Sequence, residues 1–441
     1  MESIWYRYVP NRLRTRLSGH GSLNSILHNM GWLFFDRFIR MGSGLFVGAW
    51  VARYLGPEQF GLFNFSIAFA ALFGIASTLG LDGIVVRELV KDRSRQNEIL
   101  GSAFVLKLGG SAITLMSALL VTRLIQGRNP LMLWLVGLAS AAYVFQSLNV
   151  IDFYFQSEVR SKYTVYASNA AFALMTILKI ILVLIRANLL AFAWVALGEA
   201  VLTAGFLIIA YRHNHHRIRE WRYDGEMALE LIKESWPLLL ASLAAMLYMR
   251  LDVVMLQEMV GGREVGIYAA ATRISEVWYF LPMVIVSSVS PSIINSHAES
   301  ASLYIRRMKR LYFLMTWLAI GLSLPISLLS RWIVTLLYGH QFEAAGPVLA
   351  VHLWSSVAVF LGVASSQHLL VENLQRISFY RTLIGAATNI MLNLILIPRL
   401  GAMGAAIATL VSYSVATFSM ICFRAARSHA VHLFLAPFVR S

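Results

Sequence analysis

Charged side chains stand inside otherwise apolar stretches of this sequence, where a charge is energetically costly. Six are cations and four are acids: Arg37, Arg40, Lys107, Lys179, Arg250 and Arg273, and Asp36, Glu199, Asp252 and Glu276. A charge at the centre of a bilayer costs at least about 2.5–3.5 kcal/mol, so such a residue normally faces a cavity or an opposite charge. Because the cations are in surplus, a cleft lined by them would bind an anionic group such as a diphosphate. It would be a poor lining for a cationic drug.

The first apolar stretch, WLFFDRFIRMGSGLFVGAWVARYLG, has three of these charges in its first turns. Asp36 and Arg40 are four residues apart, so they can pair along one helix face. Arg37 lies on the same stripe, which Gly44 and Gly48 continue. We interpret this face as the cytoplasmic mouth of a cavity, where Asp36 fixes Arg40 and both arginines bind the anion. Two alternatives stay open: arginines that snorkel to the headgroups, and a small-xxx-small helix contact through the glycines.

A second set of charges lies deeper. Arg250 follows Pro237 by 13 residues, which is about 20 Å into a helix that rises 1.5 Å per residue. This depth is too great for easy snorkelling. Arg273 and Glu276 lie in the next span, which enters from the outer face of the membrane, and they are about 12–17 Å from that outer face. The three side chains can therefore form a cluster at the cleft, and a structural ion pair inside one lobe is the alternative.

The remaining charges allow two roles each. Lys107 and Lys179 either face the cavity or are satisfied by packing or at the interface. Glu199, about 15 Å into its span, is a candidate site of ion coupling or a structural residue. Asp252 points away from Arg250 on the same helix, and we interpret it as a coupling carboxylate or as a partner to another span.

Histidine and cysteine do not indicate metal or covalent chemistry. Three histidines lie in a polar loop without a cysteine or acidic cluster that would complete a metal site. Two more lie in an apolar span, where hydrogen-bonded structural residues are favoured over proton carriers. These residues are His213, His215, His216, His352 and His368. The single cysteine, Cys422, excludes a disulfide within one chain. No metal, cofactor or catalytic residue is therefore predicted.

Composition identifies the class of protein that positions these residues. The chain is 58% hydrophobic and 13% charged, whereas soluble domains are about a quarter charged. Apolar runs of about 20 residues, the length that crosses a bilayer, recur along the chain. The sequence therefore predicts an all-α integral membrane protein embedded in the lipid bilayer. The net charge of +15 is typical of basic loops that hold the cytoplasmic side, and we expect no nucleic acid partner.

Twelve spans are predicted, which puts both termini on one side of the membrane. Segments on the side of the N-terminus carry more than three times as many lysines and arginines as segments on the other side. The positive-inside rule therefore predicts cytoplasmic termini. The basic first residues lack the apolar region of a cleaved signal peptide, so the spans themselves would direct insertion. The spans are 32–54, 60–81, 100–122, 131–151, 164–185, 189–211, 237–259, 266–289, 311–332, 347–370, 378–397 and 402–423.

A weak internal repeat predicts two lobes of six helices around a central cleft. YLGPEQFGLF at 54–63 resembles MVGGREVGIY at 259–268. Because each half has an even number of spans, the halves would be related by an axis along the membrane normal. The predicted divisions are an N-terminal lobe, 1–211, with a basic cytoplasmic segment, 1–28; an inter-lobe loop, 212–235; and a C-terminal lobe, 236–441.

Two longer segments resemble a known family. MGWLFFDRFIRMGSGLFVGAWVARYLGPEQFGLFNFSIAFAALFGIASTLGLDGIVVREL (30–89) and TNIMLNLILIPRLGAMGAAIATLVSYS (388–414) are similar to signatures of polysaccharide-biosynthesis flippases. These are the O-antigen (Wzx-type) members of the multidrug/oligosaccharidyl-lipid/polysaccharide (MOP) exporter superfamily. Residues 100–235 match only in span pattern.

The resemblance implies a function that the composition does not. It implies a flippase, not an enzyme, that moves an undecaprenyl-diphosphate-linked oligosaccharide across a bacterial inner membrane by alternating access. The cargo would be an O-antigen or exopolysaccharide repeat unit, as in lipopolysaccharide assembly. Coupling to a proton or sodium gradient and contact with other polysaccharide-assembly membrane proteins are also expected.

Two rival functions remain. A multidrug exporter of the same superfamily would need an acidic cavity for cationic drugs. A polysaccharide polymerase or ligase usually needs a large outer loop for acceptor chemistry, and the longest outer connection here is about 333–346.

Overall fold

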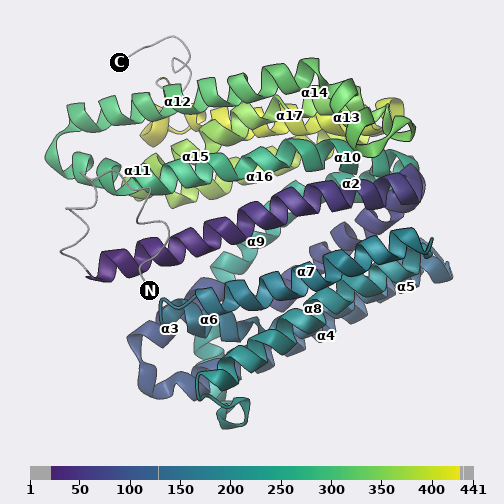
Figure 1. The fold of residues 1–441 in the computed structure, drawn as a ribbon. Coiled ribbons are helices and arrows are strands. Elements are labelled where there is room, and N and C mark those ends of the chain that lie inside the picture. Colours follow the sequence, from purple (N-terminus) through teal and green to yellow (C-terminus); the bar gives the residue numbers. More distant parts are fainter. Residues whose placement is uncertain (1–20, 128, 428–430, 432–441) are drawn as a thin grey trace.

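The computed structural model describes residues 21–127, 129–427 and 431, with side chains from residue 40 onward. These residues form helices and no strands (Figure 1). The helices are α2 (Gly21–Thr78), α3 (Asp82–Lys91), α4 (Gln96–Ile125), α5 (Pro130–Gln146), α6 (Val150–Ser157), α7 (Lys162–Leu184), α8 (Leu189–His213), α9 (Gly225–Met259), α10 (Gly262–Glu276), α11 (Phe280–Glu299), α12 (Ala301–Leu328), α13 (Ser330–Tyr338), α14 (Ala345–His352), α15 (Ser355–Val371), α16 (Gln375–Leu400) and α17 (Ala402–Phe418).

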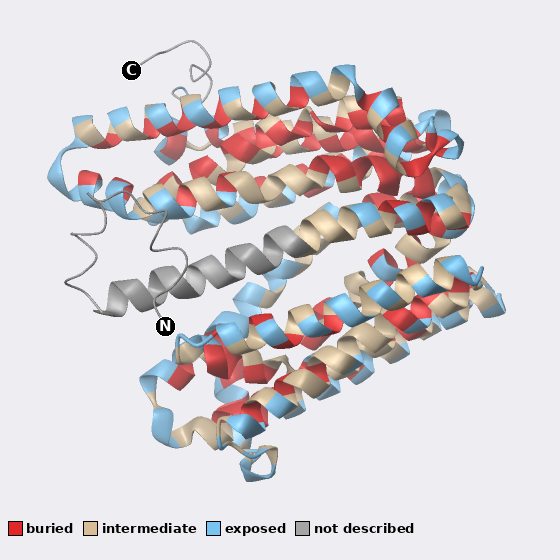
Figure 2. Cartoon of the chain, in the orientation of Figure 1, coloured by how far each residue is buried: buried red, intermediate tan, exposed pale blue. Residues whose placement is uncertain are grey.

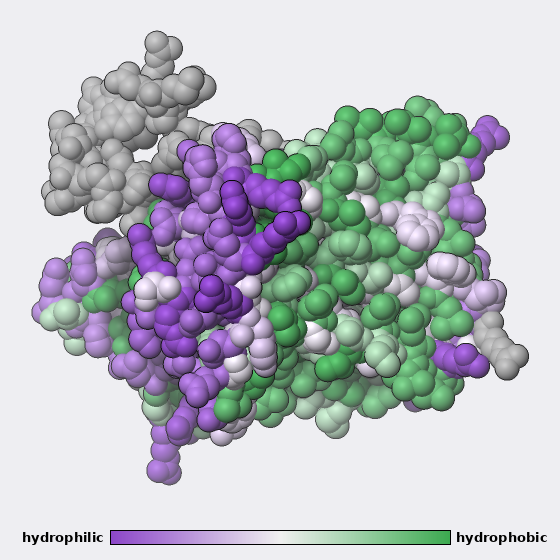
Figure 3. All heavy atoms as spheres, turned by 90° about the horizontal axis from the view of Figure 1, so that it is seen from below, coloured by the Kyte–Doolittle hydropathy of each residue, from purple (hydrophilic) through white to green (hydrophobic). Residues whose placement is uncertain are grey.

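Eleven segments of the described chain are long and apolar enough to cross a membrane. The first of them, Arg40–Lys91, contains a kink at Gly56 that joins two helices, and it therefore accounts for the first two predicted spans. The surface carries a broad hydrophobic band with polar residues gathered at one end and a thinner polar fringe at the other (Figure 3). The predicted all-α, two-lobe membrane fold is confirmed.

The lobes lie on either side of α2 and α9 (Figure 1). Helices α3–α8 form one lobe and α10–α17 the other, and by chain order α2 is counted with the first lobe and α9 with the second. Helix α9 begins at Gly225, well before the predicted span at 237–259, because the Asp224 side chain caps it by accepting a hydrogen bond from the Met227 amide at 2.7 Å. The predicted inter-lobe loop, 212–235, covers the end of α8 and the first turns of α9, and this division of the chain stays a prediction.

The inter-lobe connection is docked onto the N-terminal lobe. The Arg222 amide donates to the carbonyl of Asn97, and the His216 imidazole lies 2.7 Å from the Tyr154 hydroxyl and stacks on Tyr211. Burial against these rings lowers the pKa of His216. One of the three loop histidines is therefore a packed residue, whereas His213 is exposed.

The two copies of the repeat turn the chain in the same way. Gly56 has φ 77° and ψ 168°, and Gly261 has φ 96° and ψ 174°. Residues other than glycine rarely adopt these backbone angles. Each glycine ends one helix and starts the next, so the repeat is a pair of matched corners, one in each lobe.

The two corners pack directly against each other. A Cβ on Gly61 would lie 1.7 Å from the carbonyl oxygen of Gly262, and a Cβ on Gly266 would lie 1.9 Å from the carbonyl oxygen of Pro57. Buried residues gather around this contact, where α2, α10, α13 and α14 meet (Figure 2). We call this region the repeat contact. It joins the lobes at the end that the charge distribution predicts to be outer.

Candidate functional site

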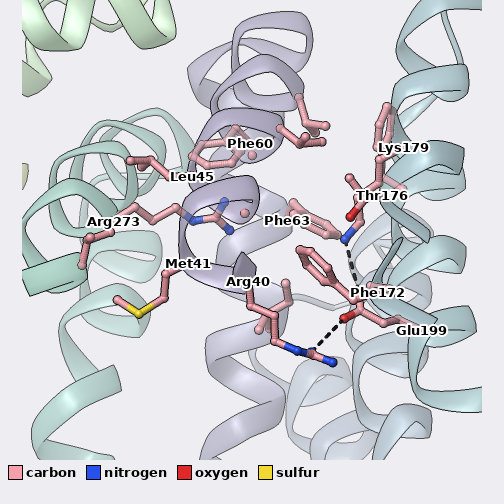
Figure 4. Close-up of a pocket in the computed structure, with 18 residues that line it drawn as sticks. Arg40, Met41, Leu45, Phe60, Phe63, Phe172, Thr176, Lys179, Glu199 and Arg273 are labelled. Carbon is pink, nitrogen blue, oxygen red and sulfur yellow. Dashed lines mark hydrogen bonds and ion pairs between the residues drawn. The ribbon is translucent and has the colours of Figure 1, made fainter. Parts of the chain in front are cut away.

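A cavity of about 430 Å³ lies between α2, α7, α8 and α10. Four charged side chains line it: Arg40 from α2, Lys179 from α7, Glu199 from α8 and Arg273 from α10 (Figure 4). The rest of the lining is mostly apolar or aromatic. Because the described lining has three cations and one acid, it presents surplus positive charge in a setting where apolar walls strengthen electrostatic attraction.

Glu199 is the counter-ion of two cavity cations. Its carboxylate lies 3.3 Å from the Lys179 ammonium and 3.8 Å from the Arg40 guanidinium. The three side chains are each about a quarter exposed. Arg40 also lies over the ring of Phe172, with 5.2 Å between its Cζ and the ring centroid. Among the described side chains of the cavity, these two cations therefore share one acid.

Arg273 reaches the cavity from the other lobe. Its Nη2 donates to Asn64 Oδ1 at 3.1 Å, and its Cζ lies 5.1 Å from the ring centroid of Phe60. A Cβ on Gly48 would lie only 2.7 Å from Arg273 Nη1, whereas a Cβ on Gly44 would meet nothing within 4 Å. The two glycines of the predicted stripe therefore make room for the guanidinium and the cavity. The alternative of a close helix contact through both glycines is not observed.

No ion pair among the described residues joins the predicted cluster of Arg250, Arg273 and Glu276. Arg250 and Glu276 are half-buried and form no ion pair with a described residue. Arg250 belongs to α9, and Arg273 and Glu276 belong to α10, which follows it after the turn at Gly261.

Asp252 lies in a separate, fully buried site of the C-terminal lobe. Its carboxylate accepts hydrogen bonds from Tyr268, Asn393 and Thr409, each at 2.8 Å. Asn389 accepts a further hydrogen bond from Asn393 at 2.9 Å. No cation among the described residues pairs with this carboxylate. A buried carboxylate held only by neutral groups is stabilised when it binds a proton or a small cation.

The sequence interpretation did not identify the neighbours of Asp252. Asn389 and Asn393 are four residues apart in an apolar span, so both lie on one helix face. This spacing could have indicated a polar site, but neutral amides cost less free energy in a membrane than charges and are therefore a weaker signal in the sequence. Tyr268 is the aromatic residue of the second repeat copy. Its hydrogen bond to Asp252 becomes visible only in the folded structure.

The other predicted residues lie outside the cavity or outside the described side chains. Lys107 is buried on α4, 3.3 Å from the Asp82 carboxylate and 5.1 Å from the ring centroid of Phe153, and it does not line the cavity. The side chains of Asp36 and Arg37 lie outside the described residues.

The two span histidines are hydrogen-bonded, as interpreted from the sequence. His352 Nδ1 lies 2.7 Å from the Ser275 hydroxyl and His368 Nδ1 lies 2.8 Å from the Tyr304 hydroxyl.

Replacing Glu199 by glutamine is expected to tighten binding of inorganic pyrophosphate several-fold. The change removes the only described acid of the cavity lining and leaves Lys179 and Arg40 without their shared counter-ion. Calorimetry on the purified protein measures this affinity. Glu258→Gln is the matched control, because Glu258 is exposed and lies outside the cavity. Unchanged or weaker binding in Glu199→Gln would show that the cavity is not the anion site.

Family models match most of this chain. The model described as polysaccharide biosynthesis protein matches residues 26–297, and one described as MatE matches residues 237–395. Two relatives from Haloferax volcanii are similar. The probable low-salt glycan biosynthesis flippase Agl15 is 23% identical over 387 residues, covering 85% of this chain and 79% of Agl15. The probable flippase AglR is 32% identical over 178 residues, and the match spans only 39% of this chain and 37% of AglR.

Solved structures share the fold. An inward-facing multidrug resistance MATE family transporter of the MOP superfamily has a TM-score of 0.70 at 17% identity, covering 90% of this chain and 95% of that one. The lipid II flippase MurJ, in an inward closed conformation, has a TM-score of 0.64 at 13% identity and covers 94% of both chains. These likenesses concern the fold of two lobes.

Proposed function

The chain belongs to the polysaccharide biosynthesis protein family, and on this basis we propose that it flips an undecaprenyl-diphosphate-linked oligosaccharide between membrane leaflets. The named flippases and transporters among its relatives support a multi-pass membrane transporter rather than an enzyme. The cargo proposed is an O-antigen or exopolysaccharide repeat unit. Its headgroup and sugars would occupy the cleft while the polyprenyl tail stays in lipid.

The sign of the cavity charge carries this proposal. Among the described lining residues, the cations Arg40, Lys179 and Arg273 outnumber the one acid, Glu199. Such a lining suits the oxygens of a diphosphate, which arginine binds through charge-assisted hydrogen bonds. A second cavity of about 180 Å³ adjoins the first and is lined in part by Ser66, Tyr143 and Gln146. We assign it to the first sugar, because it offers hydroxyl, amide and aromatic surface.

The second candidate is a multidrug exporter, favoured by the MatE match and the MATE fold. A surplus of cations would repel the cationic drugs that such an exporter carries, and this favours the glycan flippase. For the polymerase or ligase, the described part of the chain offers no large outer loop. The predicted outer connection, 333–346, folds into α13 and a short turn.

Asp252 is our candidate for ion coupling. Its buried carboxylate lacks a described cationic partner, so a proton or sodium ion could neutralise it and bias the lobes toward one state. Glu199, the other predicted coupling residue, already neutralises part of the cavity charge and is better explained as a counter-ion.

We propose that the protein lies in a bacterial inner membrane with both termini in the cytoplasm. The distribution of lysine and arginine between the loops supports this orientation. A reporter fused after Ser441 is expected to be active in the cytoplasm, and one inserted after Gln126, between α4 and α5, is expected to be external. An external signal from the fusion at the C-terminus would contradict the twelve-span orientation.

Arg250→Ala is expected to lower surface glycan at least tenfold in a flippase-null strain that the wild-type chain complements. The change removes a positive charge that lies deep in its span, 13 residues after Pro237. Arg250→Lys should restore part of the glycan because it keeps the charge. The control, Arg376→Ala, removes an exposed arginine at the start of α16. Wild-type glycan in Arg250→Ala, at equal protein level, would exclude Arg250 from the mechanism.

A further inference from the structure

Arg273 connects the two lobes through neutral contacts. It belongs to α10, yet its hydrogen-bond acceptor, Asn64, and its aromatic neighbour, Phe60, both belong to α2. Asn64 is itself fixed, because its amide nitrogen donates to the carbonyl of Phe60 at 2.6 Å. This bond directs the amide oxygen of Asn64 toward the guanidinium. One N–H donor of a cavity arginine therefore forms a hydrogen bond between the lobes.

The guanidinium remains available to an anion. It lines the cavity (Figure 4) and pairs with no acid among the described side chains. A guanidinium has five N–H donors, and the structure shows one of them on Asn64. A hydrogen bond to a charged phosphate oxygen is about twice as strong as one to a neutral amide. An anion in the cavity can therefore bind the donors that are not on Asn64, and its stronger attraction favours moving the guanidinium away from Asn64.

The hydrogen bond between Asn64 and Arg273 lies next to the repeat contact. Phe60 packs edge-on against Phe342, with 5.9 Å between centroids, and also against Tyr338. The next residue, Gly61, touches the backbone of Gly262. Loss of the bond between Asn64 and Arg273 would therefore remove a hydrogen bond between lobes within one helical turn of their closest approach.

We infer that Asn64 is a positioning residue that holds Arg273 across the lobes, and that a bound phosphate group takes Arg273 from it and weakens the repeat contact. Binding of the cargo headgroup would thereby favour opening at the outer end. This inference rests on the proposed function only in that the cargo carries a phosphate. It gives the cavity arginine two successive partners, one in each state of the transporter.

Two substitutions at Asn64 test the inference in opposite directions. Asn64→Ala removes the acceptor, so the outer end should open without an anion and pyrophosphate should change it little. Asn64→Asp converts the contact into an ion pair, so the outer end should stay closed and at least tenfold more pyrophosphate should be needed. Spin labels on cysteines at Ile125 and Leu336, two exposed positions on opposite lobes, report the distance in a Cys422→Ser background.

Gln341→Ala is the matched control. The Gln341 amide donates to the carbonyl of Arg53 near the repeat contact. Its loss should widen the resting distance, and pyrophosphate should still widen it further because the bond between Asn64 and Arg273 is intact. Shifts of Asn64→Ala and Asn64→Asp in the same direction, or no shift in either, would overturn the inference. If calorimetry finds no pyrophosphate binding to the wild-type protein, the proposed function fails. The resting distances of the two variants then still decide whether Asn64 holds the lobes together.

Discussion

Asp252→Asn is expected to reduce surface glycan at least tenfold while leaving the protein folded and in the membrane. Asparagine keeps the size of the side chain and can still hydrogen-bond with Tyr268, Asn393 and Thr409, which contact Asp252 in the structure. It cannot bind a proton or a cation through a negative charge. The variant would therefore lose coupling without losing the packing of the C-terminal lobe.

The physical reason is the cost of a buried charge. An ionised carboxylate without a cationic partner is very unfavourable in a low-dielectric interior, and three neutral donors offset only part of that cost. The site is therefore expected to alternate between a loaded state and an unloaded state. An ion gradient would set which state is occupied, and α9, which carries Asp252, is one of the two helices that lie between the lobes.

Thermal unfolding of the purified protein identifies the ion. A ligand that binds only the folded state stabilises it by about 2.7 kcal/mol at a concentration 100 times its Kd. If sodium is the ion, the wild-type protein should melt at a higher temperature in sodium chloride than in choline chloride. If the proton is the ion, it should melt at a higher temperature as the pH falls.

Asp252→Asn should lose whichever of these responses the wild-type protein shows. Asp82→Asn is the control, because Asp82 is largely exposed and pairs with Lys107 outside the cavity. A sodium or pH response that persists in Asp252→Asn, together with normal surface glycan, would remove this carboxylate from coupling.

Helix class and span count could be predicted from the sequence because apolar length and loop charge determine them directly, and the internal repeat predicted the two lobes. Of the predicted charges, Arg40, Lys179, Glu199 and Arg273 line the cavity. Lys107 is different, because the turn at 92–95 between α3 and α4 brings it beside Asp82. Spacing along the chain does not reveal that turn. Asn64 was also missed, because a neutral amide in an apolar span gives only a weak signal.

The repeat illustrates the same limit more sharply. Gly–X–X–X–X–Gly in both halves predicted related corners, and the matching angles of Gly56 and Gly261 agree with that prediction. The sequence did not indicate that one corner packs on the other. That contact depends on the arrangement of the two lobes, which brings Gly61 and Gly266 against backbone atoms of the opposite corner.

Gly61→Ala is expected to reduce transport at least tenfold by preventing the lobes from closing at the repeat contact. The new Cβ would lie 1.7 Å from the carbonyl oxygen of Gly262 and 2.8 Å from the amide nitrogen of Gly266. Both obstacles are backbone, so no rotamer change relieves the clash, and the lobes must separate. Each lobe keeps its own core, so the protein should accumulate normally while its outer end stays open.

The corresponding glycine of the other repeat copy, Gly266, gives the same prediction for the other lobe. Gly266→Ala should have the same effect, because its Cβ would lie 1.9 Å from the carbonyl oxygen of Pro57. Gly109→Ala is the control: nothing lies within 4 Å of its Cβ, and alanine stabilises a helix by about 0.5–1 kcal/mol relative to glycine. Surface glycan measures transport, and the distance between spin labels at Ile125 and Leu336 measures opening of the outer end. Normal transport in Gly61→Ala would show that this contact does not have to close, because the transport cycle would then proceed with the two corners held apart.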